Sequence, residues 1–131
     1  MTDRLIAAAV AARAHAYAPY SEFAVGAAIR DEQGRIHAGC NVENAAYPQG
    51  VCAEAGAISA LVLAGGRRIT EVVVVGGGDG LCSPCGGCRQ KIREFAAPDV
   101  VIHVCGADGT LRRSFTLDEL LPHSFGPENL A

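Results

Sequence analysis

The chain has 131 residues, 50% of them hydrophobic and 19% charged, a composition that excludes an intrinsically disordered chain and fits one globular domain spanning residues 1–131. Its 11 basic and 14 acidic residues give a net charge of −3. Because phosphate binding needs clustered lysine and arginine, and no basic run here exceeds the pair Arg67–Arg68, we expect no nucleic acid polymer as a partner.

The first half of the chain predicts a helix, a hairpin and a second helix. Residues 2–18 are rich in alanine and end before a proline, which favours a helix. Apolar and β-forming residues at 23–29 and 36–42, on either side of a turn that contains glycine, predict two paired strands. Residues 52–64 carry an apolar pattern closed by two glycines, which is typical of a helix.

The second half of the chain adds strands and helices in alternation. A run of valines at 72–75 is typical of a buried strand, and residues 86–96 predict a helix that ends before a proline. Residues 100–105 and 111–115 have the composition of strands, and residues 117–121 predict a short helix. This order of elements predicts an α/β fold, a three-layer α/β/α sandwich around one mixed sheet of about five strands.

The only candidate for a membrane or export segment is the apolar stretch Leu5–Ala12. It is far shorter than the roughly 20 residues needed to span a bilayer. The residues before it carry no net positive charge, because Asp3 offsets Arg4. We therefore expect an ordinary helix here, no membrane partner, and a cytoplasmic protein whose cysteines are reduced.

Three of the six cysteines stand close together in the segment Cys82–Cys88. A disulfide framework belongs to small secreted chains with little core, and an iron–sulfur run of this type needs a further cysteine where the sequence has Ile92. A redox-active pair and a zinc site both fit the C-x-x-C spacing, and the spacing alone does not separate them. The zinc interpretation, with Cys85 and Cys88 joined by a remote third cysteine, accounts for more of the other features.

Cys52 and Cys85 each stand at the predicted start of a helix. The free backbone N–H groups and the positive dipole end of a helix stabilise a thiolate, so two such ends can hold several anionic sulfurs at one metal. Glu54, two residues after Cys52, can then approach the metal without binding it and act as a general acid and base on zinc-bound water. A glutamate also favours a helix N-terminus for structural reasons alone, and this second interpretation of Glu54 stays open.

At these residues the chain resembles a known family. Cys-Ala-Glu at 52–54, followed by Pro-Cys-x-x-Cys at 84–88, resembles the zinc-dependent cytidine deaminases, in their small homotetrameric branch with three cysteine ligands. The similarity continues in the same order and spacing through four further stretches: Pro19–Ser21, Phe23–Ala28, Gly39–Pro48 and Ser124–Glu128. It implies a cytidine deaminase-like catalytic domain over residues 1–131.

The resemblance implies a hydrolytic enzyme of pyrimidine salvage. One Zn²⁺ per subunit, held by Cys52, Cys85 and Cys88, binds a hydroxide that attacks C4 of cytidine or 2′-deoxycytidine. Glu54 carries the protons, first to N3 and then to the departing amine. The products are uridine or 2′-deoxyuridine and ammonia.

The resemblance also implies which residues contact the nucleoside: Phe23, Asn41, Glu43, Ala46, Tyr47, Ala53 and Phe125. Asn41 and Glu43 are two apart on a predicted strand, so both project from one face, where the resemblance has them bind the ribose hydroxyls. The backbone at Ala53 approaches the base, and Phe23 packs over the nucleoside.

Three of these residues imply a shared site. Phe125 resembles the tail aromatic that reaches the base from a neighbouring subunit, and Ala46 and Tyr47 match a segment that completes a neighbour's site. With 16 glycines and no tryptophan, the chain also has few bulky side chains for a core of its own. We therefore expect a homotetramer whose sites are completed by neighbouring subunits.

One position departs from the family: close relatives have an arginine directly after the catalytic glutamate, and this chain has Ala55. Such an arginine offsets the net negative charge of zinc with three thiolates, and we hypothesise that the helix dipoles, helped by Arg89, replace it. Two alternatives stay open. One is deamination of another aminopyrimidine nucleoside, of the blasticidin type, and the other is a non-catalytic structural zinc module with Cys82 as its fourth ligand.

Overall fold

The computed structural model describes residues 1–131 and contains one mixed five-stranded sheet with the strand order β2-β1-β3-β4-β5. Its elements follow the chain in this order: α1 Thr2–Arg13, β1 Val25–Asp31, β2 Ile36–Cys40, the 3₁₀ helix η1 Tyr47–Gln49, α2 Ala53–Leu63, β3 Ile69–Gly76, α3 Gly86–Phe95, β4 Ala96–Cys105, β5 Leu111–Thr116, α4 Leu117–Leu120 and the 3₁₀ helix η2 Pro127–Leu130. Strands β3 and β4 run parallel, and the other neighbouring pairs are antiparallel. The helices are too short or too polar for any of them to span a bilayer.

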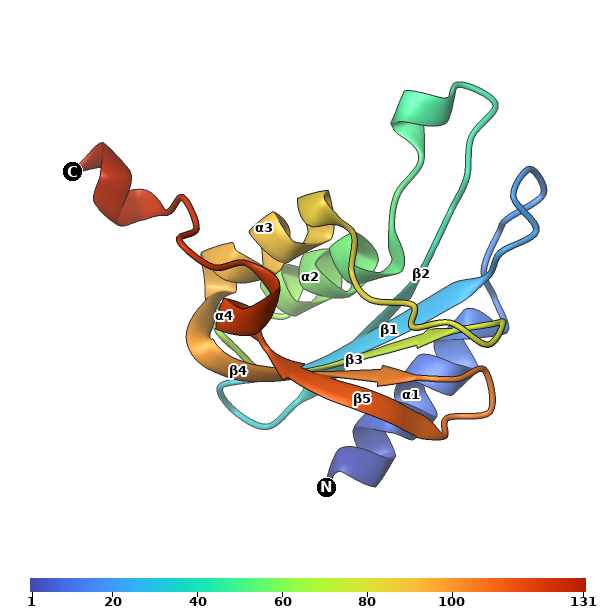
Figure 1. The fold of residues 1–131 in the computed structure, drawn as a ribbon, viewed down its shortest axis with the longest axis horizontal. Coiled ribbons are helices and arrows are strands. Elements are labelled where there is room, and N and C mark those ends of the chain that lie inside the picture. Colours follow the sequence, from blue (N-terminus) through green and yellow to red (C-terminus); the bar gives the residue numbers. More distant parts are fainter.

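The predicted order of elements and the three-layer α/β/α architecture are confirmed. Figure 1 shows α1 against one face of the sheet and α2 and α3 against the other. In β3, Val72 and Val74 pack in a cluster with residues of α2 and α3, whereas Val73 and Val75 pack with residues of α1. Because successive side chains of a strand point to opposite faces, a strand covered on both faces is apolar throughout.

The first helix is shorter than the sequence predicts, since α1 ends at Arg13 and not at residue 18. The Tyr17 N–H donates to the Asn41 C=O at 2.9 Å, and the Tyr17 C=O accepts from the Glu43 N–H at 2.8 Å. These hydrogen bonds to a distant segment take the place of those that a further helical turn would make. Strand β4 also differs from prediction, since it begins at Ala96 and not at residue 100.

A buried carboxylate holds the β1–β2 hairpin at its turn. Asp31 is 1% exposed, and its oxygens accept hydrogen bonds from His37 Nε2 at 2.9 Å, from Arg35 Nε at 2.7 Å and from two backbone N–H groups of the turn. Burial by itself raises the pKa of this carboxyl, but the hydrogen bonds from His37 and from the turn outweigh burial and hold the pKa well below its usual range. Arg35 also donates to the Ala64 C=O at the end of α2, at 2.9 Å, so the hairpin fixes the far end of that helix.

Candidate zinc centre and active site

Two helix N-termini converge on the α2–α3 side of the sheet. Cys52 is the N-cap residue of α2, Cys85 is the N-cap residue of α3, and Cys88 lies in the first turn of α3. Their three sulfur atoms lie within 4.8 Å of one another. The fold brings them together because both helices pack side by side on the same face of the sheet (Figure 1).

This donor set fits zinc. A tetrahedral zinc with Zn–S bonds of about 2.3 Å places its sulfur ligands about 3.8 Å apart, which agrees with the spacing of the three sulfurs. Thiolates are soft ligands that zinc prefers, and a site with three protein ligands keeps an open position, as catalytic zinc sites do. Cys52 and Cys85 are exposed and Cys88 is buried, so the cluster is reached from the solvent side.

The surroundings affect the three thiols unequally. The backbone N–H of Cys88, in the first turn of α3, holds the pKa of the Cys85 thiol below its ordinary value. Burial raises the pKa of the Cys52 and Cys88 thiols. Metal binding at this cluster therefore releases protons, because ligation requires thiolates.

Glu54 lies in the first turn of α2, where it is only 4% exposed. Burial raises the pKa of its carboxyl. A carboxyl whose pKa moves towards neutral pH is suited to accept a proton and to return it. Glu54 also lines a cavity beside Cys52 and Cys85. Its position therefore allows proton transfer in that cavity, in addition to stabilising the N-terminus of α2.

That cavity has a volume of about 200 Å³ and opens onto the cluster. It brings together five of the residues selected from the sequence: Asn41, Cys52, Ala53, Glu54 and Cys85. Val25, Cys82 and Ser83 also line it, and none of the three was predicted as a substrate contact. Val25 stands in a stretch that resembles the family, and Ser83 stands in the cysteine segment. These positions in the sequence could have identified both as cavity residues.

Strand β2 is shorter than predicted, so Asn41 and Glu43 lie beyond its end. Both flank Val42 in an extended stretch, and their joint binding of the ribose stays a prediction. Strand β2 ends at Cys40, and Val42 forms single bridges with two other segments. The backbone hydrogen bonds of Val42 make this stretch a separate extended segment. Asn41 lines the cavity beside Glu54, and Glu43 lines a second one.

The Asn41 side chain connects the cavity wall to the start of β1. Its amide oxygen accepts from the Val25 N–H at 2.8 Å, and its amide nitrogen donates to the Phe23 C=O at 2.9 Å. An amide has two N–H donors and two acceptor lone pairs, so one of each is still available to a bound hydroxyl. Asn41 therefore combines a structural role with a place in the cavity.

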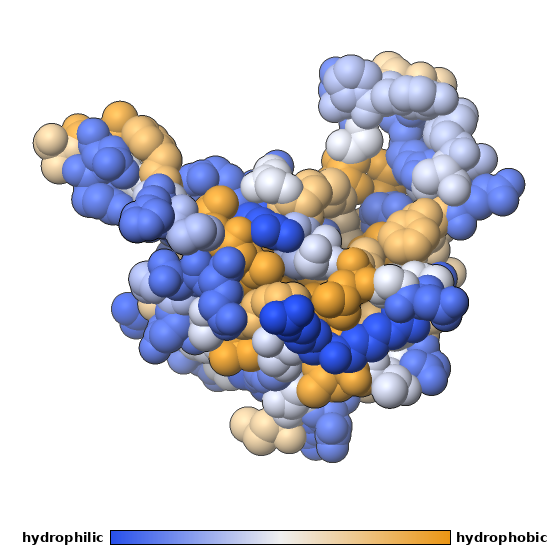
Figure 2. Space-filling model, in the orientation of Figure 1, coloured by the Kyte–Doolittle hydropathy of each residue, from blue (hydrophilic) through white to orange (hydrophobic).

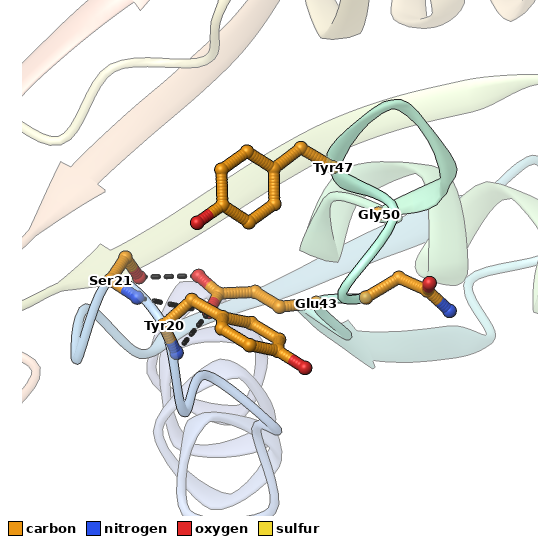
Figure 3. Close-up of a pocket in the computed structure, with 6 residues that line it drawn as sticks. Tyr20, Ser21, Glu43, Tyr47 and Gly50 are labelled. Carbon is orange, nitrogen blue, oxygen red and sulfur yellow. Dashed lines mark hydrogen bonds between the residues drawn. The ribbon is translucent and has the colours of Figure 1, made fainter.

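The second cavity, of about 340 Å³, lies between the loop before β1 and the β2–α2 connection (Figure 3). The Glu43 carboxylate accepts hydrogen bonds from the backbone N–H groups of Tyr20 and Ser21, at 2.9 and 3.1 Å, and from the Ser21 hydroxyl. The Ser21 hydroxyl and these N–H groups hold the pKa of Glu43 below its usual value. The rings of Tyr20 and Tyr47 lie 5.9 Å apart in an edge-to-face arrangement, so Glu43 is an anion that joins two loops beside an aromatic pair.

Three predicted contact residues line neither cavity: Phe23, Ala46 and Phe125. Phe23 is 41% exposed, and it approaches the same point of β3 as the Cys82 side chain. Ala46 lies on the β2–α2 connection, and Phe125, which is 56% exposed, lies on the C-terminal segment. Both segments project from the body of the molecule (Figure 1), so the predicted roles of these two residues depend on a second subunit.

Two neighbours of the cluster, Cys82 and Arg89, were each assigned a role from the sequence. Cys82 lines the cavity but does not belong to the group of three sulfurs, so a structural site closed by this fourth cysteine is not formed. Arg89 directs its guanidinium to the oxygen atoms of Pro84, Ser83 and Leu120. These contacts hold two backbone segments, and the role of Arg89 in offsetting the charge of the sulfurs stays a prediction.

Gly39 of β2 allows α2 to lie directly against the sheet. A Cβ at this position would stand 2.5 Å from the Ala53 carbonyl oxygen and 2.5 Å from the Ala57 nitrogen of α2, closer than van der Waals contact allows. We predict that Gly39→Ala shifts the turn that carries the metal ligand and the acid, lowers the free energy of unfolding by about 1–3 kcal/mol and lowers the zinc content. Gly80→Ala is the matched control, because a Cβ there meets no atom within 4 Å. Thermal unfolding and metal analysis test this, and unchanged values for Gly39→Ala would contradict it.

Comparison with known proteins agrees with this geometry. Residues 1–104 match the family model described as the cytidine and deoxycytidylate deaminase zinc-binding region. A cytidine deaminase from Sporosarcina psychrophila is 41% identical over 129 residues, which cover 98% of this chain and 94% of that protein. A crystal structure of cytidine deaminase from Burkholderia pseudomallei matches with a TM-score of 0.88 at 41% identity, over 95% of this chain and 99% of the other. A crystal structure of cytidine deaminase from Mycobacterium leprae matches with a TM-score of 0.81 at 46% identity, over 93% of this chain and 98% of the other. The chain therefore belongs to the cytidine deaminase family.

Proposed function

We propose that this chain hydrolyses cytidine and 2′-deoxycytidine to uridine and 2′-deoxyuridine with release of ammonia, a reaction of pyrimidine salvage. Residues 1–131 act as one catalytic domain in the cytoplasm, where reducing conditions keep the ligand cysteines available. The observation that carries this proposal is the buried carboxyl of Glu54, in a cavity that opens onto three sulfurs suited to zinc. The net charge of −3 favours a free nucleoside over a polymer as the substrate.

The chemistry divides between the metal and Glu54. When bound by Cys52, Cys85 and Cys88, one zinc per subunit acidifies a water molecule and so supplies the nucleophile for C4 of the pyrimidine. Glu54 takes up one proton of that water and delivers it to N3. It then takes the proton of the hydroxyl now on C4 and passes it to the amine, so that the C4 carbonyl forms, the C4–N bond breaks and ammonia leaves. The raised pKa of Glu54 supports transfer in both directions.

The substrate contacts follow from the same cavity. Asn41 offers its second amide N–H to a ribose hydroxyl, and the small side chain of Ala53 leaves the backbone beside Glu54 open to the base. Phe23, partly exposed beside the cavity wall, provides an aromatic face for the nucleoside. Glu43 is held as an anion by the loop before β1, where it supplies acceptors for the ribose.

We further propose that the active protein is a homotetramer whose sites are completed by neighbouring subunits. The β2–α2 connection and the C-terminal segment project from the molecule (Figure 1), and Figure 2 shows apolar surface in the hollow between them. Large apolar side chains are exposed on these two segments and on the loop before β1: Tyr17, Tyr20, Phe23, Val42, Tyr47, Val51 and Phe125. Exposed apolar surface of this extent is typical of an interaction site.

Mixed oligomers test whether a neighbour contributes to the site. Glu54→Gln and Phe125→Ala should each reduce activity strongly when expressed alone. Co-expressed, they should recover about a quarter of wild-type activity, because in randomly mixed tetramers that fraction of sites combines Glu54 of one subunit with Phe125 of another. The assay measures uridine formation by oligomers purified through two different affinity tags. Mixed tetramers without recovered activity would contradict the shared site.

The reaction itself is tested with the zinc-loaded protein and cytidine, by measuring uridine and ammonia. Equal amounts of the two products, absent with Glu54→Gln, support the proposed reaction and its proton carrier. Ammonia released from a blasticidin-type nucleoside but not from cytidine would assign the enzyme to that substrate. A folded, zinc-loaded protein that deaminates neither compound would contradict the proposed function.

A further inference from the structure

The side chain of Arg89 joins segments that are far apart in the sequence. Arg89 follows the buried Cys88 in α3. Its Nε atom donates to the Pro84 C=O at 2.7 Å, and its two terminal nitrogens donate to the Leu120 C=O at 2.8 Å and to the Ser83 hydroxyl at 3.3 Å. The guanidinium therefore ties the segment that enters α3 to the end of α4.

The two loop residues that Arg89 holds determine the position of a metal ligand and of a cavity wall. Ser83 lines the cavity beside Glu54, and the buried Pro84 directly precedes Cys85. The proline ring fixes φ, so the peptide that leads to Cys85 can reorient mainly about one remaining torsion of Pro84. A donor 2.7 Å from the Pro84 carbonyl oxygen restricts this torsion and with it the direction of the Cys85 side chain.

The other end of this connection is firmly held. Helix α4 begins with a capping box in which Thr116 and Glu119 exchange hydrogen bonds, and Leu117 is buried in the core. Leu120 is the last residue of this helix, so its carbonyl is a fixed acceptor for the guanidinium. Arg89 can therefore transmit the position of α4 to the loop that carries Cys85.

We propose that Arg89 is a positioning residue of the zinc centre, which aims Cys85 at the metal and holds the Ser83 wall of the cavity. It acts through geometry, because its planar fork binds two acceptors of the loop and a third in α4 at the same time. A lysine ammonium has the same charge but is a compact donor that does not reproduce this fork. The effect on zinc affinity is independent of the substrate, whereas the effect on turnover rests on the proposed function.

Two substitutions separate geometry from charge. Arg89→Lys and Arg89→Gln should both bind zinc about 10- to 100-fold more weakly than the wild type, the usual effect of losing a residue that orients a metal ligand. Competition with a chromophoric chelator measures this affinity. The absorption bands of the cobalt(II)-loaded protein, which report the geometry of the thiolate ligands, should change in both variants. With cytidine as substrate, kcat/KM should fall by a similar factor.

Arg112→Ala is the matched control. Arg112 donates to the Gly80 C=O at 2.7 Å, in the same β3–α3 connection but away from Cys85, so zinc affinity should stay within about twofold of the wild type. Wild-type zinc affinity in Arg89→Lys would overturn the positioning role. If Arg89→Gln then lost affinity, the positive charge alone would be sufficient, and if Arg89→Gln also kept its affinity, neither the charge nor the fork would be needed.

A milder variant keeps the test valid if the Arg89 variants fold poorly. Ser83→Ala removes one of the three hydrogen bonds and should weaken zinc binding by less than the Arg89 substitutions. If the Arg89 variants fail to fold, Ser83→Ala decides the test. Unchanged zinc affinity and an unchanged cobalt(II) spectrum in this variant would count against the proposal. The wild-type protein could prove inactive on cytidine while the Arg89 variants still bind zinc more weakly than it does. That result would support the positioning role and contradict the proposed function.

Discussion

Glu54→Gln should lower kcat for cytidine by a factor between about 10² and 10⁴. The amide has nearly the shape of the carboxyl, so the cavity is kept, but it can neither accept the proton of the water nor deliver one to N3 and the amine. The effect is large because Glu54 is buried in the cavity beside the cluster, where bulk water is a poor substitute as a proton carrier. The steady-state rate of uridine formation measures it.

Zinc content and stability serve as internal controls for this variant. Glu54 does not belong to the group of three sulfurs, so Glu54→Gln should retain its zinc. Replacing a buried carboxyl by a neutral amide should not lower the melting temperature. A variant that keeps more than about a tenth of the wild-type kcat would contradict the proton-transfer role, and loss of zinc would instead identify Glu54 as a ligand.

Cys88→Ser should remove zinc from the protein. Cys88 is 0% exposed, so the substitution changes the donor atom while it nearly conserves the buried volume. A hydroxyl is a much weaker zinc ligand than a thiolate, and we expect the affinity to fall on the order of a thousandfold. Activity should be lost, and so should the increase in melting temperature that zinc confers, because a ligand of the folded state stabilises that state. Metal analysis and thermal unfolding with and without a chelator measure both effects.

Cys82→Ser is the matched control for Cys88→Ser. Cys82 stands in the same segment and lines the same cavity, but its sulfur lies outside the group of three. The Cys82→Ser variant should therefore retain its zinc. Zinc loss in this variant would support a closed structural site, and full zinc retention in Cys88→Ser would show that Cys88 is not a ligand.

Most elements of the fold were predictable because their signals are local. The turn between β1 and β2, the glycines after α2 and the valine run of β3 each specify a short stretch without reference to distant residues. The start of α3 was predicted for the same reason, since Cys85 follows a proline and precedes a regular helical pattern. These elements therefore lie within a few residues of the predicted bounds.

The errors occur where distant segments pair. The residues around Tyr17 are compatible with a helix, but the backbone of Tyr17 forms hydrogen bonds with Asn41 and Glu43. Helix α1 therefore ends before the predicted residue 18. The same pairing, together with the bridge between Val42 and Val51, holds Asn41 and Glu43 in an extended segment beyond the end of β2. No pattern within either segment indicates these contacts, because they depend on how the two loops meet above the sheet.

The sequence by itself determined the two short motifs and their place at helix starts, Cys52 with Glu54 on α2 and Cys85 with Cys88 on α3. Spacing within one helical turn is set by backbone geometry, so residues so close in sequence have nearly fixed relative positions. Only the tertiary structure decided that the two helix ends meet, that Cys82 stays outside the cluster and that Arg89 binds oxygen atoms of the loop and of α4. Distances between segments depend on the packing of α2 and α3 against the sheet, and that packing is a property of the whole chain.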